Sequence, residues 1–260
     1  MTLIQLQAES LTTAFFVITR VTTLFSTNPV FGHRAIPAMA RITLGILTSF
    51  LIIPLVPPAD SESITLSGFT IGLVSEFFLG LSIGLLITMM FSVAVVAGQS
   101  VSSAAGIHIA SFFDATLKTP ATVVVTLKTI ILFLIFLSLD YHHIIIRSVA
   151  YSFRVLPPGH ISIDYAIGPF LARLFSAIIE TAFTMTVPAL LVVLIVQLAM
   201  AIIARIAPQM NVFFSVGGIL NISLALMVLT LSFPTIAAIF EGFMSTMDDH
   251  IMELFQYFGP

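Results

Sequence analysis

Residues 76–114 read EFFLGLSIGLLITMMFSVAVVAGQSVSSAAGIHIASFFD, and no residue between the two ends carries a charge. A helix that crosses the hydrocarbon core of a membrane needs about 20 mostly apolar residues, and this run is longer. The stretch from Glu180 to Glu241 is similar, with Arg205 as its one charged residue. Such runs are too apolar for a water-soluble core, so we expect an all-α protein that works in or against a membrane.

The overall composition excludes several classes of protein. The chain is 58% hydrophobic, has a net charge of −3 and contains no basic tract, which argues against a nucleic-acid partner. It has no cysteine, which excludes disulfides and thiolate metal sites. Residues 1–10 are polar with no basic segment, so we expect no cleavable leader. We also expect no separate catalytic domain on a membrane tether.

Apolar runs between proline and glycine breaks predict the helices. Pro188 lies in the middle of the fifth run, and we expect it to kink that helix or divide it into two. The expected helices cover residues 11–27, 42–56, 68–97, 121–139, 169–205, 216–236 and 237–257.

Small residues recur at helical spacing within the first long run. Gly68, Gly72, Gly80 and Gly84 are separated by four or eight positions, and Gly98 belongs to a second such series. Small residues at this spacing let helix backbones approach closely within a membrane. The contact is made either within this chain or with other subunits.

Four ionisable residues lie within or at the margins of apolar runs: Arg20, Glu76, Lys128 and Glu180. A charge at this depth is costly, so each residue needs a partner, water or a protein environment. One hypothesis pairs Arg20 and Lys128 with Glu76 and Glu180 as buried structural charges. The other is a proton or ion relay. We favour the structural role, under which a neutral Gln at position 76 preserves function.

Motifs of known enzymes are absent. There is no HExxH, no GxSxG and no phosphate-binding glycine loop, so we expect no catalytic residue and no cofactor. His142 and His143 follow Asp140, but adjacent side chains point about 100° apart on a helix and make a poor pair of metal ligands. We interpret them as a polar cluster in a loop or at a helix end, and we expect no metal site.

The segment from 97 to 120 reads AGQSVSSAAGIHIASFFDATLKTP. It is too mixed for a span and too apolar for a solvated loop. Irregular backbone at membrane depth is tolerated where protein buries it or water lines it, so a re-entrant or pore-facing segment over 98–120 fits. An interfacial helix is the alternative.

Several motifs, in order along nearly the whole chain, resemble the FliR family. They are NPVFGHRAIPAMAR at 28–41, AGQ at 97–99, GIHIASFFD at 106–114, SFRVLPPG at 152–159 and ARIAPQMNVFFSVGG at 204–218. Family members usually have Pro after the aspartate and often Gln before the later proline. Ala115 and Thr119 occupy those positions here, which predicts a looser turn after Asp114.

The resemblance implies a non-enzymatic subunit of the flagellar type III protein export gate, within the basal body at the bacterial inner membrane. It implies a part similar to FliP over about 1–168 and a helical hairpin similar to FliQ over about 169–260. The implied partners are FliP and FliQ, the export proteins FlhB and FlhA, unfolded flagellar substrates and membrane lipid.

Two sites follow within this framework. We expect a plug of the closed pore, in which Gly106 frees the backbone and apolar side chains exclude water. Its residues are Gly106, Ile107, Ile109, Phe112, Phe113, Asp114 and Lys118, of which the last two anchor its end. We expect Pro208, Gln209 and Asn211 to turn the chain between the two helices of the hairpin.

Other classes of function remain open at this point. The gate subunit of a virulence type III secretion system is similar in sequence to the flagellar one. A secondary transporter or ion channel would show inverted repeats with broken helices at matched positions, and the sequence shows neither clearly. The absent motifs disfavour an intramembrane enzyme.

Overall fold

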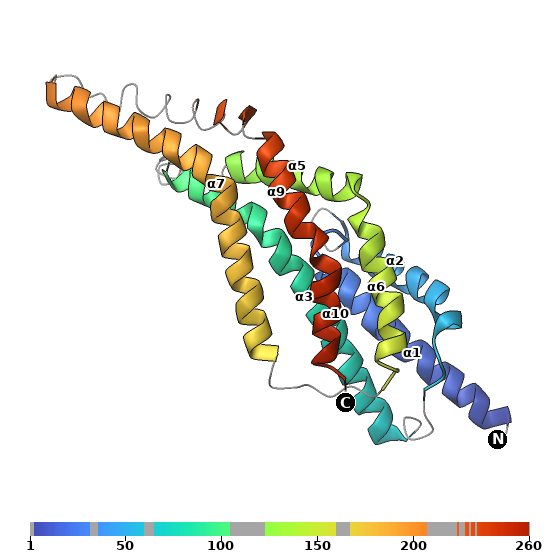
Figure 1. The fold of residues 1–260 in the computed structure, drawn as a ribbon. Coiled ribbons are helices and arrows are strands. Elements are labelled where there is room, and N and C mark those ends of the chain that lie inside the picture. The colour runs from blue at the N-terminus through green and yellow to red at the C-terminus, as the bar shows by residue number, and fades with distance from the viewer. Residues whose placement is uncertain are drawn as a thin grey trace. The chain divides into compact units, whose positions relative to one another are not determined.

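The computed structural model describes residues 3–31, 36–59, 65–104, 123–159, 167–206 and 233–259, with positions 223, 227, 228, 230 and 231. Every regular element in these ranges is a helix, which confirms the all-α prediction. The elements in chain order (Figure 1) are α1 Leu3–Thr27, α2 Ala38–Ile52, η1 Ile53–Leu55, α3 Leu66–Ala104, α5 Val123–Ser138, α6 Tyr141–Val155, α7 Ile167–Ile206, α9 Phe233–Ser245 and α10 Met247–Gln256.

The chain forms two compact units. The first contains Met1–Phe91, Asp140–Phe175 and Ser245–Pro260, and the second contains Ser92–Leu139 and Ser176–Met244. Each unit is assembled from segments distant in sequence. The expected division near residue 168 separates a part similar to FliP from a part similar to FliQ. It does not describe how the chain packs, and it stays a prediction.

In the first unit, α2 runs back along α1. The Cβ that Gly45 lacks would lie 2.9 Å from the Cα of Thr22. Further along, the backbone N–H of Ala59 donates to the hydroxyl of Thr13 at 2.8 Å. Gly45 thus contacts Thr22, and Ala59 contacts Thr13, which comes earlier in α1. This segment therefore runs antiparallel to α1.

In the same unit, α3 runs parallel to α1, and the glycine series makes the contact. A Cβ at Gly72 would collide with the ring of Phe16, and one at Gly84 would collide with the Thr27 hydroxyl. The Thr88 hydroxyl also donates to the backbone carbonyl of Thr27 at 2.9 Å. Gly72 and Gly84 therefore contact α1 within the chain, and a contact of the series with other subunits stays a prediction.

The second unit contains the end of α3, α5, most of α7 and most of α9. Val101, Ala189 and Val193 form a buried cluster between α3 and α7. Pro188 lies inside α7, which remains one helix with a visible bend (Figure 1). The alternative in which Pro188 divides the run into two helices is therefore wrong.

Three helical segments are long and apolar enough to cross a membrane: Ala38–Leu55, Leu66–Ala104 and Ile167–Ile206. A fourth is possible if α5 and α6 together make one broken span. Hydroxyl groups inside these helices donate to carbonyls one turn earlier, as Ser82 does to Phe78 and Thr184 does to Glu180, both at 2.8 Å. Their polarity is thus satisfied without water.

Helix ends differ from the predicted ones where polar residues obscured them. Helix α6 falls between the predicted helices 121–139 and 169–205. Its apolar residues follow one face only, so it forms no apolar run in the sequence. The predicted helix 237–257 is instead two helices separated at Thr246. Pro234 is in the first turn of α9, where its missing N–H is tolerated.

Candidate functional site

The centre of the first unit is a buried ion pair between α1 and α3. Arg20 Nε donates to Glu76 Oε2 at 2.5 Å, and Arg20 Nη2 donates to Oε1 at 2.9 Å. Both side chains are 0% exposed. The two parallel bonds match the planar guanidinium to the carboxylate, the strongest geometry for such a pair.

The remaining donors of Arg20 reach the end of α6. Nη1 donates to the Ser152 hydroxyl at 2.9 Å, and Nη2 donates to the Leu156 carbonyl at 3.1 Å. The guanidinium also lies 3.9 Å from the centroid of the Phe153 ring, a favourable cation–π contact. One side chain from α1 therefore joins α3 and α6.

Glu76 has a further donor in the turn after α6. The backbone N–H of Gly159 donates to Glu76 Oε1 at 3.1 Å. Gly159 has φ 88°, a conformation that glycine adopts without strain. The motif SFRVLPPG thus supplies a hydroxyl, an aromatic ring, a carbonyl and an N–H to one buried pair. The sequence singled out this motif but gave no hint of its partner.

This geometry supports the structural hypothesis over a proton relay. Each carboxylate oxygen of Glu76 already accepts at least one hydrogen bond, and neither charged side chain is accessible to solvent. A buried charge that is paired and fully hydrogen-bonded holds its neighbours in one arrangement, whereas a relay needs access to water.

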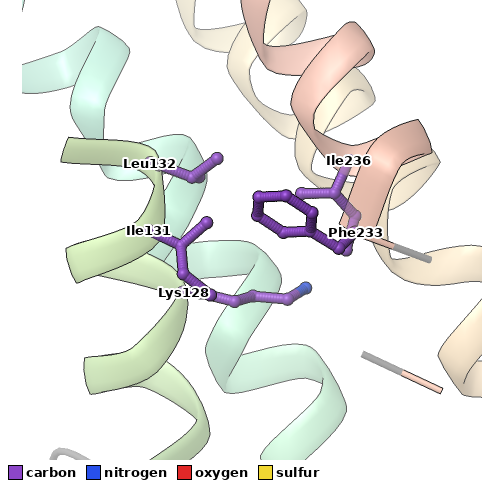
Figure 2. Close-up of a pocket in the computed structure, with 5 residues that line it drawn as sticks. All are labelled: Lys128, Ile131, Leu132, Phe233 and Ile236. Atoms are coloured by element: carbon purple, nitrogen blue, oxygen red, sulfur yellow. The ribbon is translucent and has the colours of Figure 1, made fainter. Parts of the chain in front are cut away.

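The other two predicted charges do not pair with each other. Lys128 is 2% exposed, and its Nζ has no hydrogen-bond partner within the described ranges. Glu180 is exposed on α7, so the expectation that it is buried is wrong for this chain. Figure 2 shows Lys128 reaching from α5 toward Phe233 of α9, among apolar side chains.

The predicted plug residues, 106–118, lie outside the described residues, but the helices on either side of them are described. Helix α3 ends at Ala104 and α5 begins at Val123. A Cβ at Gly98 would lie 2.8 Å from the Cα of Val125, so the two helices are in backbone contact there. The described residues on either side of this segment, Ala104 and Val123, therefore lie within a few turns of one close contact.

The end of α3 is held by a side chain that the sequence did not single out. Gln197 Nε2 donates to the carbonyl of Ala104 at 2.5 Å. Carbonyls in the last turn of a helix have no partner within it, so this bond caps α3. The sequence did contain one sign of this role, because Gln197 is a polar residue within the apolar run of α7.

The remaining predicted residues are placed as follows. Gly68 is in the first turn of α3, where its N–H donates to the Thr65 hydroxyl at 3.1 Å. The hairpin-turn residues Pro208, Gln209 and Asn211 lie outside the described residues.

The cluster at Asp140 lies at the start of α6. Asp140 has φ 58°, and its carboxylate is 3.4 Å from His143 Nδ1 and 3.9 Å from His142 Nε2. These three ligand atoms lie within 4.8 Å of one another. The sequence predicted that the adjacent histidines make a poor pair of metal ligands, whereas their ligand atoms lie close together at the start of α6.

Known proteins resemble the chain along most of its length. The profile of the family described as bacterial export proteins, family 1, matches residues 11–247. A flagellar biosynthetic protein FliR of Pectobacterium carotovorum is 29% identical over 92% of this chain and 91% of its own. The proteins of the same name from Aquifex aeolicus and Bacillus subtilis are 29% and 27% identical, over 96% and 94% of this chain and 93% and 94% of theirs.

Proposed function

The chain belongs to the family of bacterial export proteins, family 1, and is a membrane-protein subunit of a flagellar export apparatus; from this premise we propose that it forms part of the wall of the export channel. In this proposal the segment 106–118 closes the channel, and unfolded flagellar proteins pass when it moves aside. The proposed location is the bacterial inner membrane at the flagellar basal body.

The observation that carries this proposal is the arrangement around the predicted plug. A long apolar helix, α3, ends immediately before the segment, and α5 contacts it at Gly98 and Val125 immediately afterwards. Gln197 fixes the last turn of α3. A rigid base on both sides suits a segment that must move while its ends stay in place.

The proposed role is mechanical rather than catalytic. The buried pair of Arg20 and Glu76 stabilises the first unit, and Ile107, Ile109, Phe112 and Phe113 of the plug exclude water by apolar bulk. The proposed partners are FliP and FliQ as gate subunits, with FlhB and FlhA beside them. The likeness of residues 1–168 to FliP and of 169–260 to FliQ is part of this proposal.

Channel conductance tests the plug. The chain is co-expressed with FliP and FliQ of the same organism, and the assembled complex is placed in planar bilayers. Replacing both Phe112 and Phe113 with Ala should leave assembly intact and raise the ionic conductance, because the apolar seal is smaller. Leu85→Ala, at an exposed position of α3, is the matched control.

The outcome separates the parts of the proposal. An unchanged conductance in an assembled double variant would show that the segment is packing and not a plug. Failure of the unmodified chain to assemble with FliP and FliQ would refute the proposal that the chain is a subunit of the export gate. Loss of motility on deletion of the gene, restored by the unmodified gene, checks the flagellar role independently.

A further inference from the structure

Asp140, His142 and His143 bring three possible metal ligands together at the start of α6. The Asp140 carboxylate is 3.9 Å from His142 Nε2 and 3.4 Å from His143 Nδ1, and one ligand atom of each residue lies within 4.8 Å of the other two. A tetrahedral zinc ion with bonds of about 2.0–2.2 Å holds its ligand atoms about 3.4 Å apart. The observed spacing is therefore close to that of a zinc site, and small rotations of the side chains would complete it.

The environment of His142 leaves one of its two nitrogens available to an ion. Nδ1 is enclosed by the protein and has no hydrogen-bond partner among the described residues, whereas Nε2 is the nitrogen that approaches Asp140. The side chains of Asp140 and His143 are 71% and 64% exposed, so an ion can reach them from solvent. The cluster thus combines one partly enclosed imidazole with two side chains that are free to close around an ion.

The carboxylate of Asp140 is not used to cap the helix. Asp140 is the residue immediately before α6, but its side chain forms no hydrogen bond with the first turn. The partial positive charge at the start of a helix opposes a bound cation, and the negative charge of this carboxylate offsets that effect. The carboxylate is therefore available as a ligand at a place where a cation needs one.

We propose that Asp140, His142 and His143 bind one zinc-class divalent ion, with water completing a tetrahedral site. Two imidazoles and one carboxylate suit Zn²⁺, whereas Mg²⁺ and Ca²⁺ prefer sets of oxygen ligands. The ion joins the residue before α6 to the first turn of the helix whose far end holds Arg20. The site lies within the first unit and does not depend on the proposed function.

Zinc titration of the full chain tests the site. The chain is purified in detergent without a polyhistidine tag, and calorimetry is carried out at about pH 8, because metal binding requires unprotonated imidazoles. We expect one ion per chain. Asp140→Asn, His142→Gln and His143→Gln should each weaken binding more than about tenfold, since loss of even an outer-shell partner costs about 10–100-fold. His250→Gln, which changes a histidine of the same unit outside the cluster, is the matched control.

Two further measurements separate a defined site from loose association with surface groups. Co²⁺ in place of Zn²⁺ should give the intense visible absorption of tetrahedral coordination, and His143→Gln should abolish it. Zn²⁺ should raise the melting temperature of the unmodified chain but not that of His143→Gln, because only the folded cluster binds the ion. Since Asp140 and His143 are exposed, their variants should melt near the temperature of the unmodified chain when zinc is absent.

Four results would overturn the proposal. They are equal zinc affinity in the unmodified chain and the cluster variants, loss of binding in His250→Gln, displacement of Zn²⁺ by an equal concentration of Mg²⁺, and no saturable binding by a chain that shows a melting transition. The last result would leave the cluster as a polar group at the start of α6. None of them affects the proposed function, which depends on other residues.

Discussion

The backbone carbonyl of Arg20 lies against Gly80, one helical turn beyond Glu76 on α3. The missing side chain of Gly80 is therefore what lets α1 approach α3 closely enough for Arg20 to reach Glu76. The glycine series and the buried ion pair, which were separate features of the sequence, form one structural element.

Gly80→Ala should destabilise the protein, because a Cβ at this position would overlap the Arg20 carbonyl and force the helices apart. We expect a loss of about 1–3 kcal/mol in unfolding free energy, the usual cost of overpacking. Gly242→Ala is the control, since no atom lies within 4 Å of its new Cβ. Thermal unfolding in detergent measures both, and equal melting temperatures for the two variants would contradict the close contact.

Glu76→Gln should also destabilise the protein, although the sequence alone predicted that this change preserves function. The structure shows why: a neutral amide would leave the buried guanidinium of Arg20 unpaired. Removing one partner of a buried pair costs about 3–5 kcal/mol. The double variant Arg20→Met with Glu76→Leu removes both charges and should recover much of the loss. A stable Glu76→Gln variant with full export would contradict the structural role.

Gln197→Met should loosen the end of α3, because it removes the bond to the Ala104 carbonyl while keeping a side chain of similar length. One such bond contributes about 0.5–1.5 kcal/mol, so assembly should persist. We expect the channel conductance to rise, but less than in the Phe112 and Phe113 variant. Glu180→Gln, at an exposed position of α7, is the comparison, and equal conductance in the two would argue against this role.

His250 on α10 should make stability depend on pH. Burial lowers the pKa of His250 below its usual value of 6.5, and Glu253 and Asp249 offset this only in part. The unfolded chain therefore takes up a proton first as the pH falls, so the stabilisation present above pH 6.5 is lost below it. His250→Gln should weaken the decline in melting temperature between pH 7.5 and 5.5. An identical decline in both proteins would contradict the assignment.

Much of the fold follows from the sequence because membrane helices need long apolar runs, and residues 76–114 and 180–241 are unmistakable in this respect. Helix ends were less accessible. The apolar pattern does not reveal that a helix such as α1 continues through polar residues to Leu3, or that Thr246 separates α9 from α10. The site was predicted in part: Arg20, Glu76 and Lys128 stood out as charges in apolar surroundings, and pairing with an acidic residue was one hypothesis. The sequence did not say which of these charges pair.

The sequence by itself determined the all-α class, the membrane environment and the family, because composition, spacing and motifs are properties of the linear chain. Only the tertiary structure decided that Arg20 pairs with Glu76, that Ser152, Leu156 and Gly159 complete that site, and that Lys128 has no partner within the described ranges. Pairing depends on which helix faces approach, and that follows from packing between segments 56 to 136 positions apart. No local pattern encodes such an approach, because the free energy that selects it comes from the whole packed unit.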